Sequence, residues 1–156
     1  MIGRAAALAA AILVATPAAA EDGVIRVGLG QKVTVAITPD GRPGATTVEA
    51  VSEAEAAPPR PGQGRFADPP EGTLVLILGR EGDRLHLKLE SGVSRAFDYR
   101  GELITGGRRT PARVCTALPL MANYEQWPAG AEAVEISQLR FRATNEVTWS
   151  PPEGGP

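Results

Sequence analysis

The stretch from Thr73 to Tyr99, "TLVLILGREGDRLHLKLESGVSRAFDY", decides the fold class. Its first part, "TLVLILG", is a continuous apolar run, which is typical of a strand that is covered on both faces. Residues 84–90 alternate leucine with polar residues, and residues 93–99 alternate again, as half-buried strands do. Gly82 and a Ser-Gly pair mark the turns between these segments. The pattern therefore predicts a three-stranded antiparallel meander.

Further short strands are predicted on both sides of this meander. The candidates cover residues 25–29, 33–37, 45–51, 102–105, 114–118, 134–141 and 145–149. In the segment 134–141 the apolar spacing slips by one between Ile136 and Leu139, which indicates a β-bulge at Ser137-Gln138. Many short strands separated by turn residues predict an all-β fold. We expect an antiparallel β-sandwich, Ig-like or similar, with a small β-barrel as the alternative.

The first twenty residues have the organisation of a secretory signal. Arg4 gives a positive start, an apolar run follows, and three alanines before Glu21 offer a cleavage site. The apolar run is shorter than the roughly 20 residues that a membrane span needs. We therefore expect a signal peptide at 1–20, no transmembrane span after its cleavage, and a periplasmic or extracellular protein.

The exported part reads as a single β domain at 21–150 with one interruption. Residues 52–72 are rich in proline and glycine and poor in large apolar side chains, so a long exposed loop is predicted there. Arg60 and Arg65 would be its trypsin sites. The tail at 151–156 is predicted to be disordered.

The composition narrows the function classes. The chain has 16 Lys and Arg against 18 Asp and Glu. Cleavage would remove only Arg4 from this count and leave a net charge of −3, which does not suit a nucleic-acid binder. One histidine and one cysteine cannot assemble a usual zinc site within one chain. No cofactor, no metal and no catalytic residue is therefore predicted.

The single histidine and the single cysteine have open roles. Alternation places His86 on the polar face of its strand, where we expect a solvated side chain rather than a general base. Cys115 has no partner in the chain, so it is a buried inert thiol, half of an intermolecular disulfide, or a reactive thiol. The first of these is the expectation.

A ligand-binding surface is predicted around Arg108, Arg109, Tyr124 and Trp127. The arginines stand in a glycine-rich turn, and guanidinium groups hold carboxylates and phosphates. The aromatic residues stand in a predicted loop, where their rings would stack on sugars or peptides, or would instead plug the open end of the sandwich. The arginines and the aromatics leave opposite ends of the strand predicted at 114–118, so one compact site requires the chain to fold back.

These observations favour a non-enzymatic exported β-sandwich with a binding or accessory role in a bacterial cell envelope. Its partner would be an envelope protein or a polysaccharide. One alternative is a carboxylate-based hydrolase that uses a pair such as Glu81 and Glu102. Another is an envelope assembly subunit that joins its neighbours through an open sheet edge.

Overall fold

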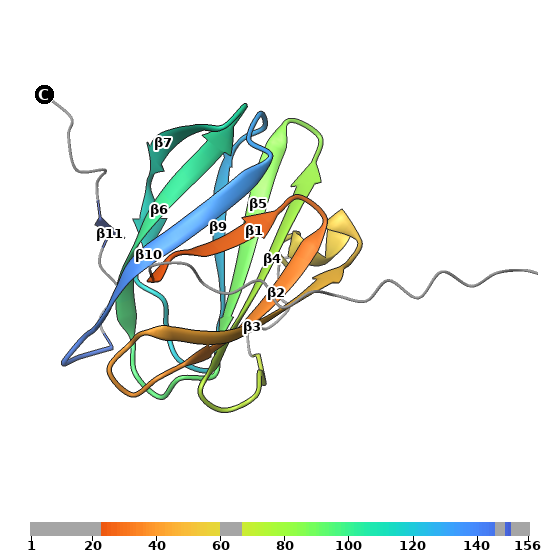
Figure 1. The fold of residues 1–156 in the computed structure, drawn as a ribbon. Helices are drawn as coiled ribbons and strands as arrows, with labels where there is room; N and C mark the ends of the chain where they lie inside the picture. Colours follow the sequence, from red (N-terminus) through yellow and green to blue (C-terminus); the bar gives the residue numbers. More distant parts are fainter. Residues whose placement is uncertain (1–22, 60–66, 146–148, 151–156) are drawn as a thin grey trace, which may run out of the picture.

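The computed structural model describes residues 23–59, 67–145 and 149–150, and they form two antiparallel sheets packed face to face (Figure 1). This confirms the predicted β-sandwich. The sheets are open, of four and five strands, and do not close into a barrel in the described part of the chain. The predicted signal peptide, the tail and both trypsin sites lie outside the described residues.

The four-stranded sheet has the order β1 (Ile25–Gly28), β10 (Ala133–Phe141), β6 (Phe97–Thr105) and β7 (Arg108–Ala112). The five-stranded sheet has the order β3 (Pro43–Ala50), β2 (Gln31–Ile37), β4 (Thr73–Glu81), β5 (Arg84–Ser91) and β9 (Ala122–Pro128). A short ladder joins β8 (Val114–Cys115) to β11 (Trp149–Ser150), and a 3-10 helix, η2, spans Glu53–Ala56.

The predicted meander is right for two strands and wrong for the third. β4 and β5 form the expected antiparallel hairpin. β6, however, pairs with β10 and β7 in the other sheet, and the neighbour of β5 is β9. Residues 92–96 cross between the sheets instead of forming a tight turn. The period-two pattern shows which face of a strand is buried, but it is the same whichever strand lies beside it.

The apolar run of β4 is covered on both faces, as predicted. Leu74, Leu76 and Leu78 belong to the main core between the sheets, and the residues between them face η2 on the outer side. Gly79 permits this cover, because a Cβ at this position would collide with the carbonyl of Glu53. The first part of the predicted loop at 52–72 therefore packs onto the sheet.

His86 differs from its expectation for the same reason. It pairs in register with Gly79, on the face that η2 approaches, and only 4% of its surface is exposed. Alternation assigned the correct face of the strand, but it did not indicate that a second element covers that face.

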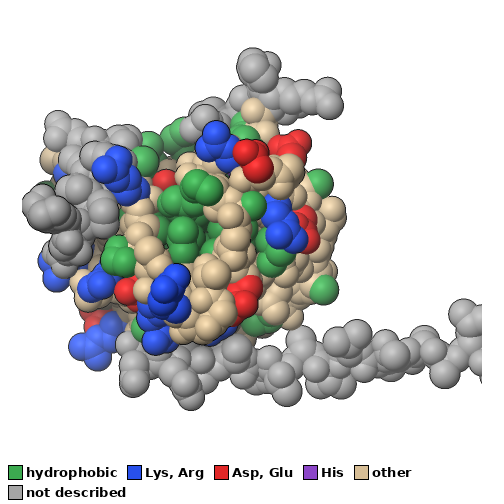
Figure 2. Space-filling model, turned by 90° about the horizontal axis from the view of Figure 1, so that it is seen from above, with side chains coloured by type: hydrophobic (Ala, Val, Ile, Leu, Met, Phe, Trp, Pro, Cys, Tyr) green, Lys and Arg blue, Asp and Glu red, His purple; other side chains and the backbone are tan. Residues whose placement is uncertain are grey.

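The predicted bulge is confirmed. The register between β10 and β6 shifts between Ser137 and Arg140, and Gln138 has a positive φ of 54°. β10 ends at Phe141, and this end of the strand lies at the end of the sandwich at which β5 connects to β6 (Figure 1). At the opposite end, hydrophobic side chains show between the sheets inside a rim of charged ones (Figure 2).

Candidate functional site

The aromatic part of the predicted site lies on β9, a strand where the sequence predicted a loop. Alternate side chains of a strand point to opposite faces, so Tyr124 and Trp127 diverge. Trp127 pairs with the buried Leu85 and is only 7% exposed, whereas Tyr124 is half-buried on the outer face beside Lys88. A proline is compatible with this strand, since Pro128 is its last residue and β9 lies at the edge of the sheet.

Trp127 also holds the segment 113–118, which follows β7 and contacts β9 at the edge of the five-stranded sheet. Its indole N–H donates to the carbonyl of Arg113 at 3.0 Å. Four residues earlier on β9, Asn123 accepts from the N–H of Leu118 at 3.1 Å and donates to the carbonyl of the same residue at 3.3 Å. Inward side chains of β9 thus bind backbone groups of a segment that also pairs through its backbone with β11 and with Phe97.

Glu125 makes the central link between β9 and this segment. Its carboxylate accepts the backbone N–H of Cys115 at 2.6 Å and the hydroxyl of Tyr99 at 3.2 Å, and only 7% of the residue is exposed. Burial raises the pKa of Glu125, although the two hydrogen bonds oppose that rise. Burial, and then the charge of Glu125, raise the pKa of the Tyr99 hydroxyl well above its ordinary value.

Cys115 was expected to be buried, but it is only half-buried and lies beside this carboxylate. Burial raises the pKa of its thiol, and the charge of Glu125 raises it further. A raised pKa reduces the thiolate fraction and hence the reactivity. The environment of Cys115 therefore disfavours nucleophilic reactivity of the thiol. It differs from the electropositive environment in which catalytic cysteines are activated.

The two arginines of the predicted site lie on the other sheet. The turn is confined to two glycines, and Arg108 and Arg109 belong to strand β7. Arg109 is engaged, because its Nε donates to the buried carboxylate of Glu135 at 2.8 Å, and Arg26 approaches the same carboxylate at 3.5 Å. Since Trp127 points into the core between the sheets, the structure does not gather the four predicted residues on one exposed surface.

The carboxylate pair suggested for a hydrolase is also separated. Glu81 ends β4 in one sheet, while Glu102 lies on β6 in the other and contacts Arg100 at 3.3 Å. Within the described ranges, no group of three or more His, Cys, Asp or Glu side chains could hold a metal ion. This arrangement gives hydrolysis no geometric support.

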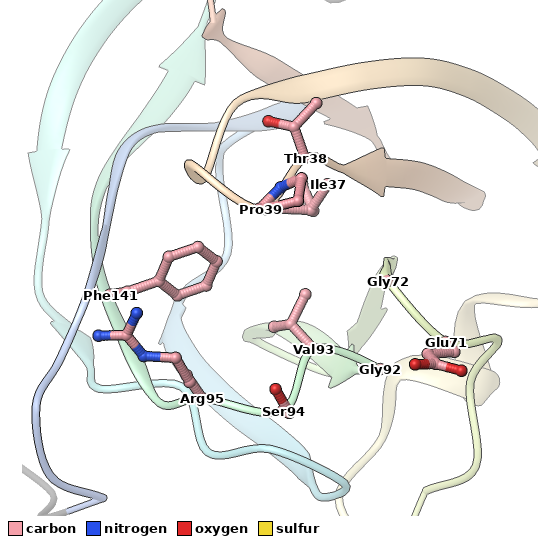
Figure 3. Close-up of a pocket in the computed structure, with 10 residues that line it drawn as sticks. All are labelled: Ile37, Thr38, Pro39, Glu71, Gly72, Gly92, Val93, Ser94, Arg95 and Phe141. Carbon is pink, nitrogen blue, oxygen red and sulfur yellow. The ribbon is translucent and has the colours of Figure 1, made fainter.

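A cavity of about 350 Å³ opens at the end of the sandwich where β5 connects to β6 (Figure 3). That volume lies within the roughly 300–1,000 Å³ of small-molecule sites. The turn after β2, the start of β4, the 92–95 loop and the end of β10 build it. Its lining residues are Ile37, Thr38, Pro39, Glu71, Gly72, Gly92, Val93, Ser94, Arg95 and Phe141.

The cavity has apolar walls and two charged side chains. Arg95 places its guanidinium carbon 5.2 Å from the centre of the Phe141 ring, and its Nη2 donates to the carbonyl of Arg142 at 2.9 Å. Glu71 lies across the cavity from this pair (Figure 3). The loop below the cavity is held in place at Gly92, where a Cβ would collide with the carbonyl of Pro70.

Comparison of the chain with protein-family models, curated proteins and solved structures finds no match. In the part of the chain that the structure describes, no helix is both long and apolar enough to cross a membrane.

Sequence reasoning missed the end cavity because its residues come from four distant segments. Arg95 offers the one available signal, since the period-two alternation of residues 93–99 puts it on the same side as Val93, Phe97 and Tyr99. An arginine at an apolar position indicates either a paired charge or a site near a surface opening.

Proposed function

We propose that this protein is an exported, non-enzymatic β-sandwich with a binding role in a bacterial cell envelope, and that the end cavity is its binding site. The signal organisation of residues 1–20 supports export. Binding is favoured over catalysis because Glu81 and Glu102 lie on different sheets and because the pKa of the Cys115 thiol is raised.

The cavity is the observation that carries this proposal. It is concave and mostly apolar, with a few polar groups, as ligand sites are. Turns and loops at one end of a rigid sandwich form most of it, and loops on a rigid scaffold commonly carry binding residues.

Two measurements test the proposal. The full chain is expressed in a Gram-negative host, and the osmotic-shock fraction should contain a protein whose intact mass corresponds to a start at Glu21. Retention of Met1 would refute export. Two-dimensional NMR of that protein with small apolar carboxylates, amides and amines should then shift amides of residues 92–95. Shifts elsewhere alone, or none, would refute binding at the cavity.

A second candidate is the assembly subunit, which β3 favours. β3 spans eight residues at the edge of the five-stranded sheet, and no strand of the described ranges pairs with its outer side. Exposed edges of this kind accept a strand from another chain. Light scattering should then detect an association that grows with protein concentration and that Ala50→Pro weakens, because the register with β2 directs the N–H of this exposed residue to the open edge. A monomer at every concentration would refute self-assembly.

A further inference from the structure

The geometry of the end cavity points to a ligand class, and the inference rests on the binding function proposed above. We infer that the cavity takes an apolar group that carries a single carboxylate, and that Arg95 binds the carboxylate while the Phe141 wall holds the apolar part.

Arg95 is positioned to bind an anion. One of its N–H groups is occupied by the carbonyl of Arg142, and the guanidinium plane is supported by the ring of Phe141. No carboxylate of the described residues forms an ion pair with it, whereas at least seven of the eleven arginines in the same ranges have an acidic partner within 4.0 Å. A fixed guanidinium with free donors matches the geometry of a carboxylate.

The apolar walls define the rest of the ligand. Ile37, Pro39 and Val93 line the cavity together with Phe141. The Phe141 ring is held edge-on against the fully buried Phe97, with the ring centres 6.4 Å apart. Because this wall is anchored in the core, an alkyl or aryl group would meet a preformed surface rather than a mobile one.

Glu71 selects the charge and the orientation of the ligand. It is the one carboxylate among the lining residues and lies across the cavity from Arg95 (Figure 3). One cation facing one anion leaves the lining neutral, which suits a monoanion better than a phosphate of higher charge. Repulsion from Glu71 directs the carboxylate of the ligand to the Arg95 side.

Two natural sources provide this chemistry, a free fatty acid and the C-terminus of a peptide. The probes are therefore octanoate with octanamide, and the tripeptide Gly-Gly-Leu with its C-terminal amide. Affinity for each is measured by NMR titration of the mature protein and of Arg95→Gln, Glu71→Gln and Arg84→Gln. Arg84 provides the matched control, because this exposed arginine lies at the other end of β5.

We expect one of the two carboxylates to bind at least tenfold more tightly than its amide. Arg95→Gln should weaken that carboxylate about tenfold, or about 1.4 kcal/mol, and leave the amide unchanged. Glu71→Gln should not weaken it, and Arg84→Gln should have no effect. The carboxylate that shows this pattern identifies the source.

Equal binding of acid and amide with shifts at residues 92–95 would overturn the carboxylate inference and leave the cavity as a binding site. Loss of affinity in Glu71→Gln but not in Arg95→Gln would also overturn it, in favour of a cationic ligand. Absence of shifts with every probe, in a variant set that keeps the wild-type spectrum, would overturn the inference and the site together.

Discussion

Replacement of Trp127 by alanine distinguishes a core residue from a ligand platform. A buried aromatic side chain removes roughly 150–250 Å² from water, which corresponds to about 4–6 kcal/mol at roughly 25 cal/mol per Å². Trp127 is only 7% exposed, and its N–H also serves the carbonyl of Arg113. Partial collapse of the site offsets some of the loss, so Trp127→Ala should lower the free energy of unfolding by about 4 kcal/mol.

Urea unfolding and thermal melts measure this effect. In a domain of this size about 4 kcal/mol lowers the Tm by more than roughly 10 °C. Trp127→Phe keeps most of the ring area and loses the hydrogen bond, so its cost should be about 1–2 kcal/mol. Tyr124→Ala, on the outer face of the same strand, should cost less than half as much as Trp127→Ala. A loss below about 1 kcal/mol for Trp127→Ala would refute the core role and restore the ring as a ligand platform.

Three further perturbations test the described structure. Burial raises the pKa of Glu125 above its unfolded value, so the native state holds the proton of this carboxyl more tightly. The free energy of unfolding should therefore fall as pH rises through the raised pKa, and over that range Glu125→Gln should become more stable relative to wild type. A stability difference between the two proteins that does not change with pH would contradict the buried carboxylate. Gly79→Ala should cost about 3 kcal/mol in urea unfolding, because its Cβ would collide with the backbone carbonyl of Glu53. Gly82→Ala meets only open space but has a positive φ of 58°, so it should cost about 1 kcal/mol. Equal costs would argue against the η2 contact. The thiol of Cys115 should react with a disulfide reagent at pH 8 much more slowly in the native protein than in urea, and equal rates would contradict its raised pKa.

The strands were readable from the sequence where hydrophobic alternation is strong. The β4–β5 hairpin, the bulge in β10 and the double cover of β4 all follow from the spacing of Leu, Val and Ile side chains. Burial of apolar side chains is the largest favourable contribution to folding, so the positions that are buried can be recognised from the spacing of apolar residues in the sequence. The order of the strands within the sheets cannot be recognised in this way, because different strand pairings would bury the same faces.

β9 escaped prediction for a related physical reason. Its inward residues are Asn123, Glu125 and Trp127, so the buried face carries polar atoms and lacks apolar alternation. Their polarity is satisfied by the backbone of 113–118, a contact between segments that only the folded chain brings together. The packing of η2 onto the outer face of β4 is equally invisible in the sequence, and it explains why His86 is buried.

Of the four residues predicted to form a ligand-binding surface, Trp127 instead helps to hold the segment 113–118, together with Asn123 and Glu125. Asn123, Glu125 and Trp127 each bind a backbone group of 113–118. Such contacts hold a segment that no strand of the five-stranded sheet pairs with, and buried backbone groups must find partners. Because these side chains are committed to structure, their chemistry is not free for a ligand. The charged groups of the end cavity are less constrained. Arg95 gives one donor to the carbonyl of Arg142, but Arg95 and Glu71 are both exposed and form no ion pair with another described residue. A charged side chain without an ion-pair partner in the described structure is the better candidate for binding a ligand. For this reason we place the candidate site at the end cavity rather than on β9.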